Sequence, residues 1–365
     1  MEQAKISSFQ LFCLILLFEL GTAIIAPIGL DAHQDAWIAV LIGMLIGLPI
    51  YWMYVFLYNR YPGLLLTGYA RTIFGPLFGW IAAFAYILFF IYGAARDLRD
   101  GLELLMLSMD LTPMFLLGAM LMVIVVYALF TGVETFSRLG EIYTFFLVFA
   151  GLAAFFFLLF SNVLNTERIL PVLEKGLMPV FTAVYGQTVM FPFGEMICFT
   201  MILPYLNDPK SGFKVGTSAI LISGIIIALV VFLEIATLGI YTLERSTFPL
   251  LAMIQRIRVG EFIQRLDALA VTGLIINDFI KVTVFSYAAL IGAADLFKQP
   301  KNRLVIPISV MTLVLSLLIA RNVEQHFQQG RIALKNIFPV FALVIPLLLV
   351  ITELIRSRLS AQKNG

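Results

Sequence analysis

Charged residues are scarce in this sequence. Asp, Glu, Lys and Arg make up 13% of its 365 residues, whereas soluble domains carry roughly 25%. Hydrophobic residues make up 61%, and the mean hydropathy is +1.00. A water-soluble fold of this size could not hide so much apolar surface, which excludes a soluble domain. A lipid bilayer accepts such surface, so we expect a membrane protein.

Cysteine and histidine are nearly absent, with two of each. Cys13 and Cys198 both lie in apolar runs and are expected to be packing residues, which excludes a disulfide framework. His33 and His326 lack the spacing of metal ligands and are expected in loops. With no nucleophile–His–acid set and no phosphate loop, the sequence indicates neither an enzyme nor a metal or cofactor. A net charge of +2 without a basic patch excludes nucleic acid as a partner.

Long apolar runs dominate the chain, and each is long enough for a helix of about 20 residues to cross a bilayer. Strands of a membrane barrel would be shorter and would alternate in polarity. We therefore predict a single all-α membrane domain over 1–365, with about ten spanning helices and the first helix retained. The predicted spans lie near 9–29, 36–58, 78–96, 113–131, 141–161, 179–204, 215–241, 266–293, 303–320 and 335–356.

The distribution of cations suggests the orientation of the spans. Lys and Arg are nearly balanced between the two sets of loops, but two local features break the tie. The first loop, 31–35, has no cation, and the short loop after the eighth span holds Lys298, Lys301 and Arg303. Because cytoplasmic loops are enriched in Lys and Arg, we expect a cytoplasmic N-terminus.

The connection at about 243–265 is the longest patterned loop. Its apolar residues recur at helical spacing, with Arg256, Arg258, Glu261 and Arg265 between them. This pattern predicts short outer helices, which either pack on the bundle surface or cap a binding vestibule.

Two predicted spans contain helix breakers at a matching depth, about a dozen residues from the start of each. The first is the run from Gly21 to Pro27, and the second is Phe191-Pro192-Phe193-Gly194-Glu195. Proline removes a backbone donor and glycine weakens a helix, so polar main-chain groups are freed inside the membrane. Corresponding breaks in two halves indicate a transporter-type site. We therefore predict two five-helix repeats, about 9–161 and 179–356. Two ordinary kinks are the alternative.

Five ionisable residues in predicted spans are candidates for function, because charge is costly inside the membrane. They are Glu19, Glu195, Glu234, Asp278 and Lys281. Asp278 and Lys281 are three residues apart and share a helix face. Either they neutralise one another structurally, or the Lys281 ammonium occupies a place where a cation would otherwise bind. Glu234 is the weakest candidate.

Three motifs resemble those of the spore germination permeases, the B subunits of germinant receptors in the amino acid–polyamine–organocation superfamily. One is Phe191-Pro192-Phe193-Gly194-Glu195. The second is the pattern Gly132-x-Glu134-x-x-x-Arg138-x-x-Glu141. The third is Phe248-Pro249-Leu250-Leu251, followed by the charged segment from Arg256 to Asp267. Length and span count match as well, so the resemblance covers essentially the whole chain.

The resemblance implies a LeuT-like fold of two inverted five-helix repeats, with helices 1 and 6 broken. It also implies residence in the spore inner membrane with a cytoplasmic N-terminus, beside an A subunit and a lipoprotein C subunit. The implied function is to sense a small nutrient, usually an amino acid, and to trigger germination.

We expect the nutrient to bind between spans one and six. Its carboxylate would accept backbone N–H groups at a half-helix N-terminus, its ammonium would face freed carbonyls, and a polar pair in span eight would line the side-chain end. The candidate ligand-binding residues are Gly21, Thr22, Ala23, Ile24, Phe191, Phe193, Gly194, Glu195, Thr283 and Tyr287.

Two other functions remain open on sequence grounds. One is a proton-coupled, sodium-independent amino acid transporter, in which Glu19, Asp278 and Lys281 would supply the titrating group. The other is a water or ion path that opens during germination. The same fold could serve each of them, since fold does not determine function.

Overall fold

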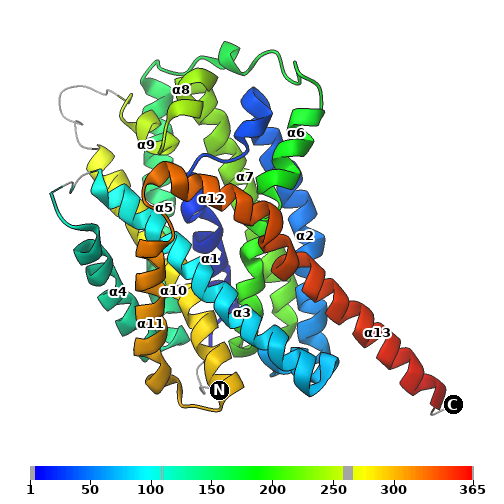
Figure 1. The fold of residues 1–365 in the computed structure, drawn as a ribbon. Helices are drawn as coiled ribbons and strands as arrows, with labels where there is room; N and C mark the ends of the chain where they lie inside the picture. Colours follow the sequence, from blue (N-terminus) through cyan, green and yellow to red (C-terminus); the bar gives the residue numbers. More distant parts are fainter. Residues whose placement is uncertain (1–4, 108, 110, 258–265, 364–365) are drawn as a thin grey trace.

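The structure is a computed structural model that describes residues 5–107, 109, 111–257 and 266–363. The secondary structure of its described part consists of helices and one isolated bridge between Ile6 and Leu206. The α-helices, shown in Figure 1, are α1 (Ser8–Leu20), α2 (Ala36–Arg60), α3 (Leu66–Met106), α4 (Met114–Thr131), α5 (Val133–Phe160), α6 (Met178–Ala183), α7 (Gly212–Leu238), α8 (Ile240–Arg245), α9 (Pro249–Ile254), α10 (Leu266–Phe297), α11 (Lys301–Leu318), α12 (Val323–Asn336) and α13 (Ile345–Lys363).

Eight helical segments of the described chain are long and apolar enough to cross a membrane. A shorter apolar helix covers Ser8–Ile24, where the first span was predicted. The predicted sixth span, 179–204, is irregular rather than one long helix. The outward faces of α4 and α5 expose large apolar side chains, such as Ile142 and Phe149. Such faces need lipid rather than water, which confirms a multi-pass membrane protein.

The helix α1 begins with a reciprocal cap and ends at Gly21. The Ser7 hydroxyl accepts a hydrogen bond from Gln10 N, and the Gln10 side chain accepts one from Ser7 N. At the other end, Gly21 leaves helical geometry and a 3₁₀ turn follows over Thr22–Ile24. The first predicted interruption is therefore present.

The second predicted interruption is present as well. After α6, one π-helical turn covers Val184–Thr188, and two 3₁₀ segments follow, Phe193–Met201 and Leu203–Tyr205. This irregular segment ends beside the N-terminus, where Ile6 N donates to Tyr205 O and Asn207 N donates to Ile6 O. The two broken segments are thus joined at one end of the bundle.

The helix α3 is much longer than expected. The predicted span 78–96 is wrong at both ends, because α3 runs from Leu66 to Met106 and packs along α10. It bends at Gly75, whose φ of 82° is open to glycine, directly before Pro76. Charged residues near its far end led the sequence to predict a loop there, but they are buried inside the bundle.

The C-terminal quarter contains a covering helix and a long tilted one. The helix α12 lies across the upper part of the bundle in Figure 1, and α13 leaves the bundle toward the lower right. The predicted tenth span, 335–356, therefore begins at the last residues of α12 and ends within α13. The predicted connection at 243–265 contains the end of α8 and all of α9, while Arg258, Glu261 and Arg265 lie outside the described residues.

Candidate functional site

A buried lysine lies where the two interruptions meet. Lys281 is on α10 and its side chain is fully buried. Its Nζ lies 2.6 Å from Glu195 Oε2, on the broken sixth segment, and donates to Thr22 Oγ1 at 2.9 Å, on the broken first segment. A Cβ added at Gly21 would lie 2.8 Å from Lys281 Cδ, so the missing side chain at the break leaves room for the lysine stem.

The helix α3 supplies a third partner that the sequence did not reveal. Asp97 Oδ1 lies 3.4 Å from Lys281 Nζ and accepts a hydrogen bond from Thr22 Oγ1 at 3.4 Å. One buried ammonium therefore contacts two buried carboxylates. The rings of Phe18 and Phe191 lie 5.2 and 4.7 Å from Nζ and add cation–π attraction. The excess negative charge can be balanced by a proton or by a cationic ligand group.

Hydrogen bonds tie the broken segments to each other and to α10. Gly29 N donates to Gln187 Oε1 at 2.9 Å, and Gln187 Nε2 donates to Pro27 O at 3.1 Å. In the amide orientation that satisfies its surroundings, Asn277 donates to Leu17 O at 3.0 Å and accepts from Gly21 N at 3.2 Å. Gln187 thus satisfies two backbone groups that have no helical partner. Asn277 instead adds to the Gly21 N–Leu17 O hydrogen bond that closes α1.

A second charged group links α3 to α12. His326 was expected in a loop, which is wrong: it lies on α12, is fully buried, and its Nε2 lies 2.7 Å from Asp100 Oδ1. Arg96 Nη2 donates to His326 O at 3.2 Å. The Arg96 guanidinium lies against Gly330 of α12, where an added Cβ would lie 2.3 Å from Nη2. The helix α12 thus covers this end of the site.

A small cavity of about 90 Å³ lies beneath α12. Its walls come from the broken first segment, α3, the broken sixth segment and α12. Both signs of charge line it, with Arg96 and Arg331 against Asp97 and Glu195 among others. Among the described residues, Arg96 Nη1 and Asp97 Oδ2 are buried without a hydrogen-bond partner. The residues that carry this unpaired donor and this unpaired acceptor both line the cavity.

The other predicted ionisable residues lie outside this cavity. Glu19 is fully buried in α1, and within the described chain neither of its oxygens has a hydrogen-bond partner. Asp278 packs against Gly101, where an added Cβ would meet its Oδ2 at 2.3 Å. Between the residues that the structure describes, no ion pair joins Asp278 to Lys281; the lysine pairs with Asp97 and Glu195 instead. Glu234 is buried in α7.

Of the predicted ligand-binding residues, Phe191 and Glu195 line the cavity, and Thr22 contacts Lys281. Phe193 packs against α2 at Gly47. Thr283 donates to Phe279 O at 2.8 Å within its own helix, and Tyr287 packs against Phe136 and Tyr205.

The remaining members of that set are also buried and do not line the cavity: Gly21, Ala23, Ile24 and Gly194. Over the described residues, no group of three or more His, Cys, Asp or Glu side chains could hold a metal ion.

Two similar solved structures are conformations of the same transporter. The chain superposes on Mhp1, a nucleobase-cation-symport-1 family transporter, in its closed conformation with bromovinylhydantoin bound. The TM-score is 0.69 at 15% identity, covering 93% of this chain and 78% of that one. The inward-facing conformation of Mhp1 gives a TM-score of 0.51 at 14% identity, covering 93% and 76%. These likenesses show a shared transporter fold.

Sequence relatives identify the family. Spore germination protein KB of Bacillus subtilis is 38% identical over 100% of this chain and 99% of its own length. Spore germination protein XB of Bacillus anthracis is 24% identical over 80% of this chain and 81% of its own length. The family described as spore germination protein matches residues 5–324. The chain therefore belongs to the spore germination permease family.

Proposed function

We propose that this protein is the B subunit of a nutrient germinant receptor. It would bind a small zwitterionic nutrient, such as an amino acid, in the cavity beneath α12. Supporting this, Arg96 Nη1 and Asp97 Oδ2 belong to residues that line that cavity and lack hydrogen-bond partners among the described residues. An amino acid supplies a carboxylate for the first and an ammonium for the second, and such convergent polar groups determine orientation in small-molecule sites.

The nutrient would act by shifting a conformational equilibrium. Its ammonium would compete with Lys281 for Asp97 and Glu195, and so alter contacts that join both broken segments to α10. A ligand shifts an equilibrium only through different affinities for the two states. The state with α12 closed over the cavity would be favoured by binding, and an A subunit and a lipoprotein C subunit would respond to that change.

The proposal also covers the arrangement of the membrane spans and the membrane in which the protein resides. We place ten spans in two inverted five-helix repeats, about 9–161 and 179–356, in the spore inner membrane with a cytoplasmic N-terminus. The likeness to Mhp1 supports this arrangement, as do the two interruptions at corresponding places. Family membership supports the spore membrane as its location.

Germination of spores that carry single variants tests the proposal. Arg96→Gln and Asp97→Asn should each abolish the nutrient response while protein level and response to a nutrient-independent trigger stay normal. Arg138→Gln is the matched control, because Arg138 is exposed and pairs with Glu134 on its own helix. A normal nutrient response in both cavity variants would show that the nutrient does not bind in this cavity.

One observation favours a second candidate, a proton-coupled and sodium-independent amino acid transporter. An ionised carboxylate without a partner is very costly to bury, so Glu19 is suited to carry a proton. The Lys281 ammonium lies at the breaks, where a transported cation would otherwise bind. Proteoliposomes that accumulate labelled amino acid under a pH gradient, and lose that activity with Glu19→Gln, would favour transport over sensing alone.

A further inference from the structure

The face that α12 turns to the cavity beneath it is mostly apolar. The lining residues on this helix are spaced so that they share one helix face: Phe327, Gly330, Arg331 and Leu334. Phe338 also lines the cavity, just beyond the end of α12. Arg331 is exposed, whereas Leu334 and Phe338 are buried. Apart from Arg331, the side chains of this wall are therefore apolar.

The buried charged residues of the cavity belong to other walls. Glu195 comes from the broken sixth segment. The charged residue that the broken first segment supplies, Asp31, is exposed. The helix α3 supplies lining residues at the same helical spacing, and three of the four are charged: Gly93, Arg96, Asp97 and Asp100. The cavity thus has a charged side, formed by α3 and the sixth segment, and an apolar side on α12.

Leu334 occupies the middle of the apolar side. The rings of Phe327 and Phe338 pack against aromatic residues outside the cavity: Phe327 lies 6.5 Å from Phe248, and Phe338 lies 5.0 Å from Phe89. Leu334 lies between these two rings along the chain and is 8% exposed. The size of its side chain therefore sets the space left on this side.

The chemistry of an amino acid relates these two sides to each other. Its carboxylate, ammonium and side chain share one carbon, so a ligand held by its charges at α3 and the sixth segment directs its side chain to the remaining walls. A polar side chain buried there without a hydrogen-bond partner would cost free energy. Gln187, the uncharged polar lining residue, is already engaged, because its amide donates to Pro27 O and accepts from Gly29 N.

We infer that the nutrient is an amino acid with an apolar side chain, and that Leu334 limits the size of the side chain accepted. This inference rests on the proposed nutrient site and names its selective wall. In an apolar pocket, one methylene group more or less changes discrimination by roughly ten- to 200-fold. The helix α12 then selects the nutrient as well as covering it.

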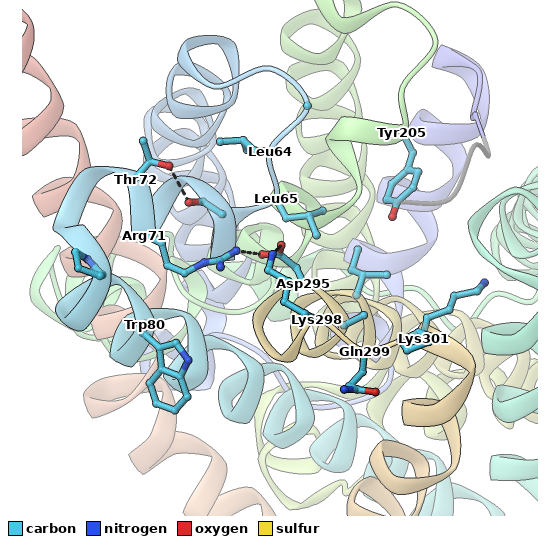
Figure 2. A pocket seen from close by; sticks show the side chains of 16 residues that line it. Leu64, Leu65, Arg71, Thr72, Trp80, Tyr205, Asp295, Lys298, Gln299 and Lys301 are labelled. Carbon is cyan, nitrogen blue, oxygen red and sulfur yellow. Dashed lines mark hydrogen bonds and ion pairs between the residues drawn. The ribbon is translucent and has the colours of Figure 1, made fainter.

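A second cavity provides a matched control for Leu334. Its volume is about 1050 Å³, and it lies between the α2–α3 connection, the first part of α3 and the turn from α10 to α11. It shares no lining residue with the cavity beneath α12. Figure 2 shows Leu64 on the α2–α3 side of this second cavity, and Arg71 paired with Asp295. The same leucine-to-alanine change is therefore possible in either cavity.

Thermal unfolding of the purified full chain in neutral detergent tests the inference. The ligands are alanine, valine, leucine and phenylalanine, and polar counterparts of similar shape, which are serine, threonine, asparagine and tyrosine. The best ligand of the wild type should be apolar and should bind more tightly than its polar counterpart.

Leu334 variants should change the size of the best ligand. Leu334→Ala should favour a larger apolar amino acid and raise its affinity roughly fifteen-fold, about fourfold for each of two newly buried methylene groups. Leu334→Phe should weaken binding of the wild-type optimum, because the larger ring fills the space. Leu64→Ala should keep the wild-type order of ligands. So should Ile332→Ala, which changes a residue of α12 that is 56% exposed and does not line the cavity.

The outcomes separate this inference from the site on which it rests. A best ligand with a polar side chain overturns the inference without any variant. An unchanged order in both Leu334 variants also overturns it, and leaves the proposed site in place if Arg96→Gln and Asp97→Asn still abolish stabilisation. Stabilisation that persists in those two variants refutes the site itself. A changed order in Leu64→Ala would place the nutrient in the larger cavity.

Discussion

Side chains at the junction of the breaks place one ammonium against two carboxylates inside a membrane protein. Burying each of these ions is costly, and the cost is recovered only when partners and hydrogen bonds are complete. Lys281 achieves this with Glu195, Asp97 and Thr22. Removing one of these charged side chains should therefore lower the stability of the fold by more than its ion pair contributes, since the remaining partners stay buried and charged.

We predict that Lys281→Met lowers the free energy of unfolding by about 3–5 kcal/mol, the usual cost of leaving a buried charge unpaired. Denaturant unfolding of the purified protein in detergent would measure it. Adding Glu195→Met should recover part of the loss, because one of the two stranded carboxylates is then gone. If Lys281→Met were as stable as the wild type, the ion pairs of Lys281 would not stabilise the fold.

The sequence indicated only part of this cluster. Glu195 and Lys281 stand out as charges within apolar runs, but their pairing depends on how α10 packs against the broken segments. Asp97 was missed because Arg96, Asp97, Arg99 and Asp100 together look like the end of a span. A count of hydrophobic residues cannot tell charges that leave the membrane from charges that neutralise one another inside it.

At the scale of helices, α12 covers the cavity, and it contacts α3 through a few groups. His326 pairs with Asp100, and Arg96 donates to His326 O. From the sequence, the connection at 243–265 was a possible cap, with packing on the bundle surface as the alternative. The residues of α12 fell mostly between the predicted ninth and tenth spans, and His326 was expected in a loop.

We predict that His326→Asn loosens α12. Hydrogen exchange of the amides over 323–336 should become faster, because Asp100 loses its buried partner. His33→Asn is the matched control: His33 pairs with Glu244 near the surface, where such pairs contribute about 0–1 kcal/mol. Unchanged exchange in the His326 variant would show that other contacts hold α12.

The helix α2 packs closely on the broken sixth segment at two glycines. A Cβ added at Gly43 would lie 2.7 Å from Thr188 O, and one at Gly47 would lie 2.5 Å from Phe193 Cβ. Gly43→Ala should therefore destabilise the protein by about 1–3 kcal/mol, as overpacking of a core does. Thermal unfolding would measure it.

Gly151→Ala provides the comparison for that variant, since nothing lies within 4 Å of its added Cβ. It should be neutral or slightly stabilising, because alanine favours a helix by about 1 kcal/mol relative to glycine. Equal behaviour of the two alanine variants would show that α2 and the sixth segment can move apart freely.

At the scale of the whole molecule, hydropathy and helix breakers were enough to predict a helical membrane protein with two interruptions. The ends of the helices were harder to predict. The helix α3 extends beyond its predicted span, because its charged residues form ion pairs inside the bundle and do not have to leave the membrane. The cavity itself was out of reach, since its walls come from four separate parts of the chain.

A nutrient that occupies the cavity should stabilise the whole fold. At about 100 times its dissociation constant, a ligand adds roughly 2.7 kcal/mol to the free energy of unfolding. Thermal unfolding with each of the common amino acids in turn should reveal a stabilising one. Arg96→Gln and Asp97→Asn should remove that effect, and Arg138→Gln should retain it. Stabilisation that persists in both cavity variants would place the nutrient elsewhere.

Lys281 is part of the chain, so its charge cannot dissociate from the site as a bound ion can. Each molecule keeps one such charge there at any salt concentration. A protein built this way keeps the same electrostatic starting point in media of very different salinity. Its response to nutrient should then change little with the salt concentration of the medium.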